Sequence, residues 1–269
     1  MSANLSPEPL LGDNEPAAVE IAACAAPAYP LLLVCDHASN RVPECLANLG
    51  VGKDVLDQHV GWDIGAAEVT RRLAEKLNVP SVYANYSRLV VDCNRPLSHS
   101  HAFPEHSDGI YIPANENIGE AEKLRRIEGI FNPYHSAVAE QLARFEGAAP
   151  AVVAIHSFTP FMDGYDRPWH CGILWDKDGR LAEPMIETLR SLQAYVIGDN
   201  EPYSGRHPED FTLDHHAEAN GLPHVAIELR QDLIEHDQGA EQWAGILAAT
   251  LKPLLADDSL YTRFSGECT

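Results

Sequence analysis

Short apolar runs of strand length alternate with amphipathic helical segments along most of this 269-residue chain. Runs rich in Val, Ile and Leu without polar alternation are typical of strands buried on both faces of a sheet. The alternation predicts a three-layer α/β/α domain with a largely parallel or mixed central sheet. The expected strands lie at residues 29–34, 81–84, 88–92, 151–158, 170–176, 194–200 and 224–230. The expected helices lie at residues 64–77, 118–145, 179–192 and 239–255, with Pro133 as a kink or boundary in the second.

The first 28 residues are rich in Pro, Ala and Glu and show no sustained periodicity. We expect a poorly ordered lead-in over residues 1–28 and a single domain over residues 29–269, because no repeat or low-complexity linker divides the remainder. The longest apolar run is far shorter than the ~20 residues that span a bilayer. The acidic start also lacks the cationic residues of a signal peptide, so we expect a cytoplasmic protein without a membrane segment.

The charge balance argues against polyanionic partners. The chain has 19 Lys and Arg residues against 40 Asp and Glu residues, a formal net charge of −21. Attraction to nucleic-acid phosphates or to anionic lipid is therefore not expected. The six cysteines form no CxxC pair, which argues against a zinc ribbon, a thioredoxin motif or a disulfide scaffold.

Three of the expected strands end in side chains that bind metals or move protons, namely His37, His156 and Glu228. Ligands of open α/β sheets bind outside the carboxyl ends of the strands, so these side chains are placed to converge. A catalytic zinc site needs about three protein ligands and an open position. With His37 and His156 as two ligands, the segment DQHVGWD offers Asp63 or His59 as the third. We favour Asp63 because it precedes a helix, although a simple helix N-cap is the plainer explanation of an Asp there.

The chain resembles the N-formylglutamate amidohydrolase family in six segments between about Tyr29 and Leu255: CDHASNRVP, DQHVGWDIGA, VVDCNRP, AIHSFTP, GDNEPYSG and VAIELRQDLI. More distantly, it is similar to zinc carboxypeptidases and aspartoacylase-type deacylases in IHS, DxNR and ELR, which occur in the same order. Any one of these short motifs occurs by chance in many proteins. Their joint occurrence in sequence order is specific.

The resemblance implies a phosphorylase/hydrolase-like fold and a zinc-dependent amidohydrolase. It implies one Zn²⁺ per chain, with His37 and His156 as ligands; another divalent ion remains open. It also implies that Glu228 is the general base, whereas the plainer alternative is a strand-end carboxylate paired with Arg230. Amide hydrolysis needs an activated water and an acid for the leaving nitrogen, and one carboxyl group can serve both proton roles.

The sequence departs from the carboxypeptidase pattern at one position. Carboxypeptidases carry a Glu three residues after their first ligand histidine, where this chain has Asn40. An amide is a poor zinc ligand, so the carboxylate must come from elsewhere in the chain. The departure strengthens Asp63 and leaves His59 open as the third ligand.

The expected substrate is a small anion, and several residues are candidates to bind it. By the resemblance, Asn94 and Arg95 match residues that bind a substrate carboxylate. Arg95 leaves an expected strand at a turn before Pro96, and its planar guanidinium suits a carboxylate, although pairing with Asp92 is an alternative. Long polar connections after strands are often binding loops. The further candidates are Arg41, Asn200, Tyr203, Arg206 and Arg230.

The remaining histidines give weaker signals. His215 and His216 are adjacent on an expected helix and face different directions, and we expect His215 to be the second catalytic residue, directed at the substrate. His99, His101 and His106 fit no standard metal-binding spacing and are expected to lie in a solvated loop.

The leading hypothesis is hydrolysis of N-formyl-L-glutamate, or a close N-acyl amino acid, to formate and L-glutamate. The resemblance places such an activity in amino-acid degradation, within histidine catabolism. One alternative is a zinc peptidase or amidase that acts on a small peptide or cell-wall fragment. A second alternative is a non-catalytic protein that binds an acidic ligand. The second predicts a broken site, whereas His37, His156 and Glu228 are all present.

Overall fold

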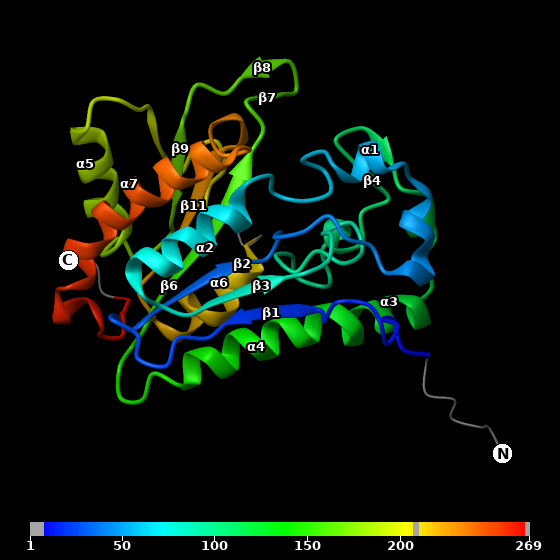
Figure 1. Ribbon diagram of the computed structural model, residues 1–269, viewed down its shortest axis with the longest axis horizontal. Coiled ribbons are helices and arrows are strands. Elements are labelled where there is room, and N and C mark those ends of the chain that lie inside the picture. Colours follow the sequence, from blue (N-terminus) through cyan, green and yellow to red (C-terminus); the bar gives the residue numbers. More distant parts are fainter. Residues whose placement is uncertain (1–7, 207–209, 267–269) are drawn as a thin grey trace.

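The computed structural model describes residues 8–206 and 210–266. Within them, one mixed sheet of seven strands runs through the molecule in the order β1–β3–β2–β6–β11–β9–β10 (Figure 1). Its strands are β1 (Val19–Ala22), β2 (Leu31–Cys35), β3 (Ser81–Ala84), β6 (Ala151–Phe158), β9 (Cys171–Leu174), β10 (Ile197–Asp199) and β11 (His224–Arg230). Strands β3, β2, β6 and β11 are parallel, β1 is antiparallel to β3, and β9 is antiparallel to β11.

Helices cover both faces of the sheet, which confirms the three-layer α/β/α prediction (Figure 1). One face carries α2 (Ala66–Leu77), α5 (Ala182–Ser191) and α7 (Asp237–Leu255). The other face carries α4 (Asn132–Ala143) and α6 (Phe211–His216). The short α1 (Lys53–Leu56) and α3 (Glu120–Arg126) lie beyond the sheet. Small antiparallel hairpins pair β4 (His106–Ser107) with β5 (Ile110–Tyr111) and β7 (Phe161–Met162) with β8 (Tyr165–Asp166).

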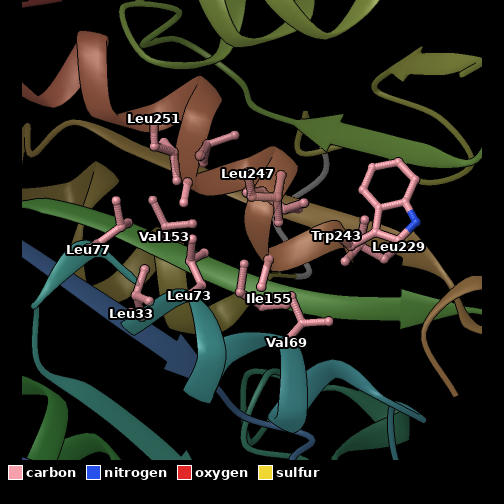
Figure 2. Packing of buried hydrophobic residues seen from close by; sticks show 14 of the residues in the cluster. Leu33, Val69, Leu73, Leu77, Val153, Ile155, Leu229, Trp243, Leu247 and Leu251 are labelled. Carbon is pink, nitrogen blue, oxygen red and sulfur yellow. The ribbon is translucent and has the colours of Figure 1, made fainter. Parts of the chain in front are cut away.

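The central strands are apolar throughout because both of their faces are buried. In β2, Leu31 and Leu33 pack with the α2 and α7 side, whereas Leu32 and Val34 pack with the α4 side. Figure 2 shows the first of these cores, where Leu33 lies near Leu73 of α2. Successive strand residues point to opposite faces, so a doubly covered strand needs an apolar residue at every position.

The carboxyl ends of β2, β6 and β11 meet at one edge of the sheet. Glu228 of β11 lies opposite His156 of β6 in the parallel register, and His37 follows the end of β2. Strand β9 runs the other way, with Gly172 opposite Glu228 and Leu174 opposite Ala226. At this edge of the sheet, β9 therefore contributes its amino-terminal end, whereas β2, β6 and β11 contribute their carboxyl ends.

The prediction of a strand at residues 88–92 is wrong. Leu89, Val90 and Val91 are buried, which explains the strand-like pattern, but they form turns rather than a ladder. Side chains bind their carbonyl groups instead: Asn115 donates to Leu89 O at 2.8 Å, and Arg126 donates to Val90 O at 3.1 Å. An apolar sequence pattern indicates that a segment is buried, and this segment is buried without pairing to another strand.

Strand β1 lies inside the segment that we expected to be a poorly ordered lead-in. It pairs along the outer edge of β3, with Val19 opposite Ala84 and Ala22 opposite Ser81. Its exposed and half-buried residues gave no periodic signal. Residues 1–7 of the same prediction lie outside the described residues.

The expected long helix at residues 118–145 is divided as Pro133 suggested. Helix α3 passes through a π-helical turn at Ile127–Phe131 into α4, whose second residue is Pro133. The π turn lies just before Pro133, so the hydrogen-bonding pattern of the helix changes where a residue without an N–H interrupts it. None of the helices in the described ranges is long and apolar enough to cross a membrane.

Candidate functional site

A cavity of about 680 Å³ lies over the carboxyl ends of β2, β6 and β11. His37, Asp63, His156 and Glu228 line its floor. It also receives Asn94 and Arg95 from the segment after β3 and residues 200–204 from the loop after β10. The structure thus brings together side chains from the strand ends that the sequence analysis singled out.

Two imidazoles and two carboxylates form a buried cluster at the floor. Asp36, His37 and His156 offer ligand atoms that all lie within 4.8 Å of one another. Asp36 Oδ1 lies 3.6 Å from His37 Nδ1 and 3.5 Å from His156 Nδ1. The Asp63 carboxylate contacts the same two nitrogens, at 3.4 Å and 3.0 Å. Both carboxylates therefore face the nitrogens that would share an ion.

Asp63 is held at the cluster by the chain around it. Its N–H donates to His37 O at 3.0 Å, and its Oδ2 accepts the Ser157 N–H at 3.2 Å. Helix α2 begins only after Gly65, and no side chain caps it. The carboxylate of Asp63 is thus directed at His37 and His156 rather than at the helix amides.

The cluster has the chemistry of a site for a divalent cation. Both oxygens of Asp36 and Nδ1 of His37 are buried and lack a hydrogen-bond partner among the described residues. An unpartnered buried carboxylate costs several kcal/mol unless a cation compensates it. Imidazole nitrogen and carboxylate oxygen in this number are the ligands of catalytic zinc sites. The donor set therefore fits a bound divalent metal.

The carboxylates also raise the pKa values of both imidazoles. Burial and the Arg88 guanidinium lower the pKa of His37, but Asp92, Asp63 and Asp36 outweigh them and raise it to about 9. Burial likewise lowers the pKa of His156, whereas Asp36 and Asp63 hold it well above its ordinary value. The cluster thus attracts positive charge, which protons or a metal ion can supply.

Asp92 supports His37 from behind. Its Oδ1 accepts from His37 Nε2 at 2.7 Å, and its Oδ2 accepts from Arg88 Nη2 at 2.7 Å. Burial raises the pKa of Asp92, but Arg88 and His37 outweigh it and hold the pKa well below its usual range. A histidine that donates one ring N–H to a carboxylate presents its other nitrogen to a metal. Asp92 therefore fixes the orientation in which His37 Nδ1 faces Asp36 and Asp63.

Glu228 projects beside the cluster from β11. Its side chain is buried, and its Oε2 has no hydrogen-bond partner in the described part of the chain. Burial raises its pKa to about 7, with Asp63 and Asp210 acting in the same direction and His156 opposing them. A carboxyl group with a pKa near neutrality can both accept and donate a proton at physiological pH.

A pair of buried histidines holds the turn that carries Asn94 and Arg95. His135 Nε2 lies 3.0 Å from Cys93 O, and His135 Nδ1 lies 2.9 Å from His216 Nε2. A carbonyl only accepts, so His135 donates from Nε2, and its Nδ1 must accept from His216 Nε2–H. Burial lowers the pKa values of His135 and His216 to about 3 and about 4, consistent with two neutral rings.

The loop after β10 crosses the sheet face because two glycines leave room for it. A Cβ added at Gly172 of β9 would lie 2.0 Å from Glu201 O, and one at Gly198 would lie 2.5 Å from the same atom. Asn200 Oδ1 anchors the loop by accepting from the N–H of Trp175 at 3.1 Å and of Gly205 at 2.9 Å. The loop brings Asn200 and Tyr203 to the cavity.

Several predicted site residues lie elsewhere. Arg41 and His215 are exposed, and the His215 ring stacks on Phe211 at 4.9 Å. Arg206 lies over the Trp175 ring at 5.5 Å, and Arg230 pairs with Asp232 at 2.7 Å. Among the residues that the structure describes, the cavity lining does not include Arg41, Arg206, His215 or Arg230. His59, the alternative third ligand, lies at the rim with its Nε2 3.0 Å from Asp108.

Sequence reasoning missed other residues that the structure brings to the site. Asp36 directly precedes His37, and an acid at the end of a fully buried strand was an available signal. Arg88 was hidden inside the segment read as a strand. His101 and His106 are exposed, as expected for a solvated loop, and they also line the cavity, which no spacing rule would have indicated.

The comparisons with known proteins agree with one another. Residues 29–235 match the family model of N-formylglutamate amidohydrolase. An N-formylglutamate deformylase from Pseudomonas putida is 26% identical over 221 residues, which cover 75% of this chain and 80% of that protein. The solved structure of gene product Atu2144 from Agrobacterium tumefaciens is 38% identical with a TM-score of 0.87, and the match covers 92% of this chain and 98% of that one.

A second solved structure supports the fold. The N-formylglutamate amidohydrolase from Ralstonia eutropha JMP134 superposes with a TM-score of 0.64 at 21% identity, over 88% of this chain and 97% of that one. The family model spans the strands that build the cavity floor, from β2 to β11. This chain belongs to the N-formylglutamate amidohydrolase family.

Proposed function

We propose that this protein is a zinc-dependent amidohydrolase that cleaves the amide bond of N-formyl-L-glutamate or of a closely related N-acyl amino acid. One observation carries the proposal: His37, Asp63 and His156, which form a buried cluster with Asp36, line the same cavity as Glu228 and Arg95. Family membership and the named activity of the Pseudomonas relatives support the choice of substrate.

Asp36, His37, Asp63 and His156 are the residues that would hold the metal. When bound, a divalent ion supplies Lewis acidity that polarises an acyl oxygen and lowers the pKa of a water molecule. His37 is oriented for this role by Asp92, and Asp63 by the Ser157 N–H. The chain thereby fixes its ligand atoms before any ion arrives, which lowers the cost of ordering them.

Glu228 has the position and the pKa for proton transfer. It accepts a proton from the attacking water while the water oxygen bonds to the acyl carbon. It then donates that proton to the leaving nitrogen as the C–N bond breaks, and formate and L-glutamate result. A pKa of about 7 balances the two halves of this cycle.

The cationic groups of the cavity lie on the β3 side of the cluster. Arg88, Asn94 and Arg95 all belong to the segment after β3, and all three line the cavity. Arg88 pairs with Asp92 at 2.7 Å, and Arg95 is the candidate to bind a substrate carboxylate through its planar guanidinium. Asn94 Oδ1 accepts the Thr212 N–H at 2.9 Å, which fixes this turn against α6.

The first experiment is to measure the metal content of the purified protein by mass spectrometry. The same sample is then assayed for formate release from N-formyl-L-glutamate before chelation, after chelation and after zinc is restored. We expect about one zinc per chain and formate release that chelation abolishes. Failure to take up zinc would refute the metal site, and zinc without formate release would exclude N-formyl-L-glutamate and leave only a related N-acyl amino acid as substrate.

Two substitutions separate the metal from the base. His156→Ala should lose metal and activity together. Glu228→Gln should retain metal and lose about 10²- to 10⁴-fold in kcat. His236→Ala, at a histidine whose side chain is 85% exposed, is the matched control and should change neither. Near-normal turnover by Glu228→Gln would show that another group is the base.

A further inference from the structure

The cavity is larger than N-formyl-L-glutamate requires. That molecule has twelve non-hydrogen atoms. Even at the ~30 Å³ that a water molecule occupies in the liquid, they would fill only about 360 Å³. The cavity measures about 680 Å³. Roughly half of it would therefore remain for other parts of a substrate.

The two sides of the cavity differ in chemistry. In the strand order, β3 lies on one side of the metal cluster, and the segment after it contributes Arg88 and Arg95. Strands β9 and β10 lie on the other side, where Leu174 and Tyr203 line the cavity together with the polar Asn200 and Ser204. Phe158 and Met162, which follow His156 along the chain, extend this second surface. We call Phe158, Met162, Leu174 and Tyr203 the apolar wall.

The apolar wall is held in place by Arg167. Its Nη1 lies 3.0 Å from the Tyr203 hydroxyl oxygen, and its Nη2 lies 2.8 Å from Met162 Sδ. The same guanidinium lies over the rings of Tyr203, at 4.9 Å, and Phe158, at 5.9 Å. One cation thus joins three residues from the end of β6, from β7 and from the loop after β10. These contacts fix the side chains of the wall relative to one another, as expected for a surface that binds a ligand.

We propose that the apolar wall is a subsite for an acyl group of several carbons, so that the preferred substrate is a glutamate acylated by an aliphatic chain. The inference rests on the proposed function. The amide must lie over the cluster, and a carboxylate bound on the β3 side directs the acyl group toward the opposite side. A formyl group has no further carbon that could contact the apolar wall, whereas a chain of about six carbons extends along it.

The test compares N-formyl-, N-acetyl- and N-hexanoyl-L-glutamate with the zinc-loaded protein. All three release L-glutamate, so one assay gives kcat/KM for each. Full burial of a methylene is worth about fourfold. With partial burial of its four additional methylenes, N-hexanoyl-L-glutamate should exceed N-acetyl-L-glutamate by at least about tenfold. A kcat/KM that falls with each added carbon would overturn the inference and leave the proposed function intact.

Two variants on the β7–β8 hairpin test whether the preference for the longer acyl chain depends on the apolar wall. Met162→Ala should lower the hexanoyl-to-acetyl ratio several-fold. Tyr165→Ala, whose residue is 76% exposed on the same hairpin, should leave the ratio unchanged. An unchanged ratio in Met162→Ala would remove the apolar wall from substrate binding. Absence of L-glutamate from all three compounds would refute the proposed function itself, and the inference with it.

Discussion

Replacing Asp92 by Asn tests whether the carboxylate behind His37 prepares it for a metal. Asp92 accepts from donors on both of its oxygens, from His37 Nε2 on one and from Arg88 on the other. Asparagine has the same shape but only one acceptor oxygen. In either orientation of the amide, its NH₂ group faces a donor, either the Arg88 guanidinium or the His37 Nε2–H. With the NH₂ group toward Arg88, the amide oxygen still accepts from His37 Nε2–H and from the Asn94 N–H, but a neutral amide replaces the carboxylate. With the NH₂ group toward His37, the ring loses its acceptor.

In both orientations the negative charge behind the ring is lost, which makes His37 Nδ1, the nitrogen that faces Asp36 and Asp63, a weaker metal ligand. Loss of such a supporting partner lowers metal affinity by about 10- to 100-fold, which corresponds to about 1.4 to 2.7 kcal/mol. We expect this increase in the Kd for Zn²⁺, measured at neutral pH by competition with a chromogenic chelator.

The matched control for Asp92→Asn is Asp57→Asn, which makes the same charge change at a half-exposed residue bonded to Lys53 and Asn40. Its Kd for Zn²⁺ should equal that of the unmodified protein. Circular dichroism of both variants checks that they are folded. A folded Asp92→Asn protein with an unchanged Kd would show that Asp92 does not prepare His37, and the argument from its 2.7 Å contact would fail.

Other predictions follow from the same geometry. Gly172→Ala places a methyl group 2.0 Å from Glu201 O, so the free energy of unfolding should fall by about 1 to 3 kcal/mol in urea titrations, with a raised KM. The lowered pKa values of His135 and His216 mean that, at this pair, the unfolded chain binds more protons than the folded chain below pH 6.5. The contribution of the pair to stability should therefore fall by about 2 kcal/mol or more from pH 6.5 to pH 4, measured as the difference between the unfolding profiles of the unmodified protein and of the double variant His135→Phe, His216→Phe, and a difference that does not change with pH would contradict the pairing. Arg95→Ala should raise KM for N-formyl-L-glutamate more than it lowers kcat, and unchanged kinetics would transfer carboxylate binding to another cation.

The parts of the fold that were predictable from the sequence are those where burial and periodicity agree. Strand β6 and strand β11 match their predicted limits, because an uninterrupted apolar run fits a strand covered on both faces. Residues 88–92 share that burial, but their carbonyl groups bind Asn115 and Arg126 instead of another strand. Sequence periodicity contains no information on where a backbone carbonyl finds its partner. Strand β1 was missed for the opposite reason, since it pairs without being buried.

In the candidate site, too, some residues could be predicted from the sequence and others could not. His37, His156 and Glu228 were accessible to sequence reasoning because parallel strand ends must meet at one edge. Arg230 follows Glu228 by two residues, yet it pairs with Asp232 and does not line the cavity that the described residues form. Asp36 required knowledge of how the turn after β2 directs its side chain. Strand position locates a residue along the sheet, whereas turn geometry decides whether its side chain enters the site.

Because β9 runs in the reverse direction, the residues proposed for catalysis and the residues that form the opposite side of the cavity come from different kinds of structure. The first depend on strand register, and the second depend on a loop. The proposed metal and base residues lie at the ends of β2, β6 and β11, where a one-residue shift in register would separate them. The opposite side of the cavity is formed partly by the loop after β10, which passes over Gly172 and Gly198 and is joined to β9 at its start through Asn200. Loop length can therefore change in descendants of this protein while strand register stays fixed. Substrate range can diverge through insertions and deletions there, and the hydrolytic chemistry is inherited unchanged.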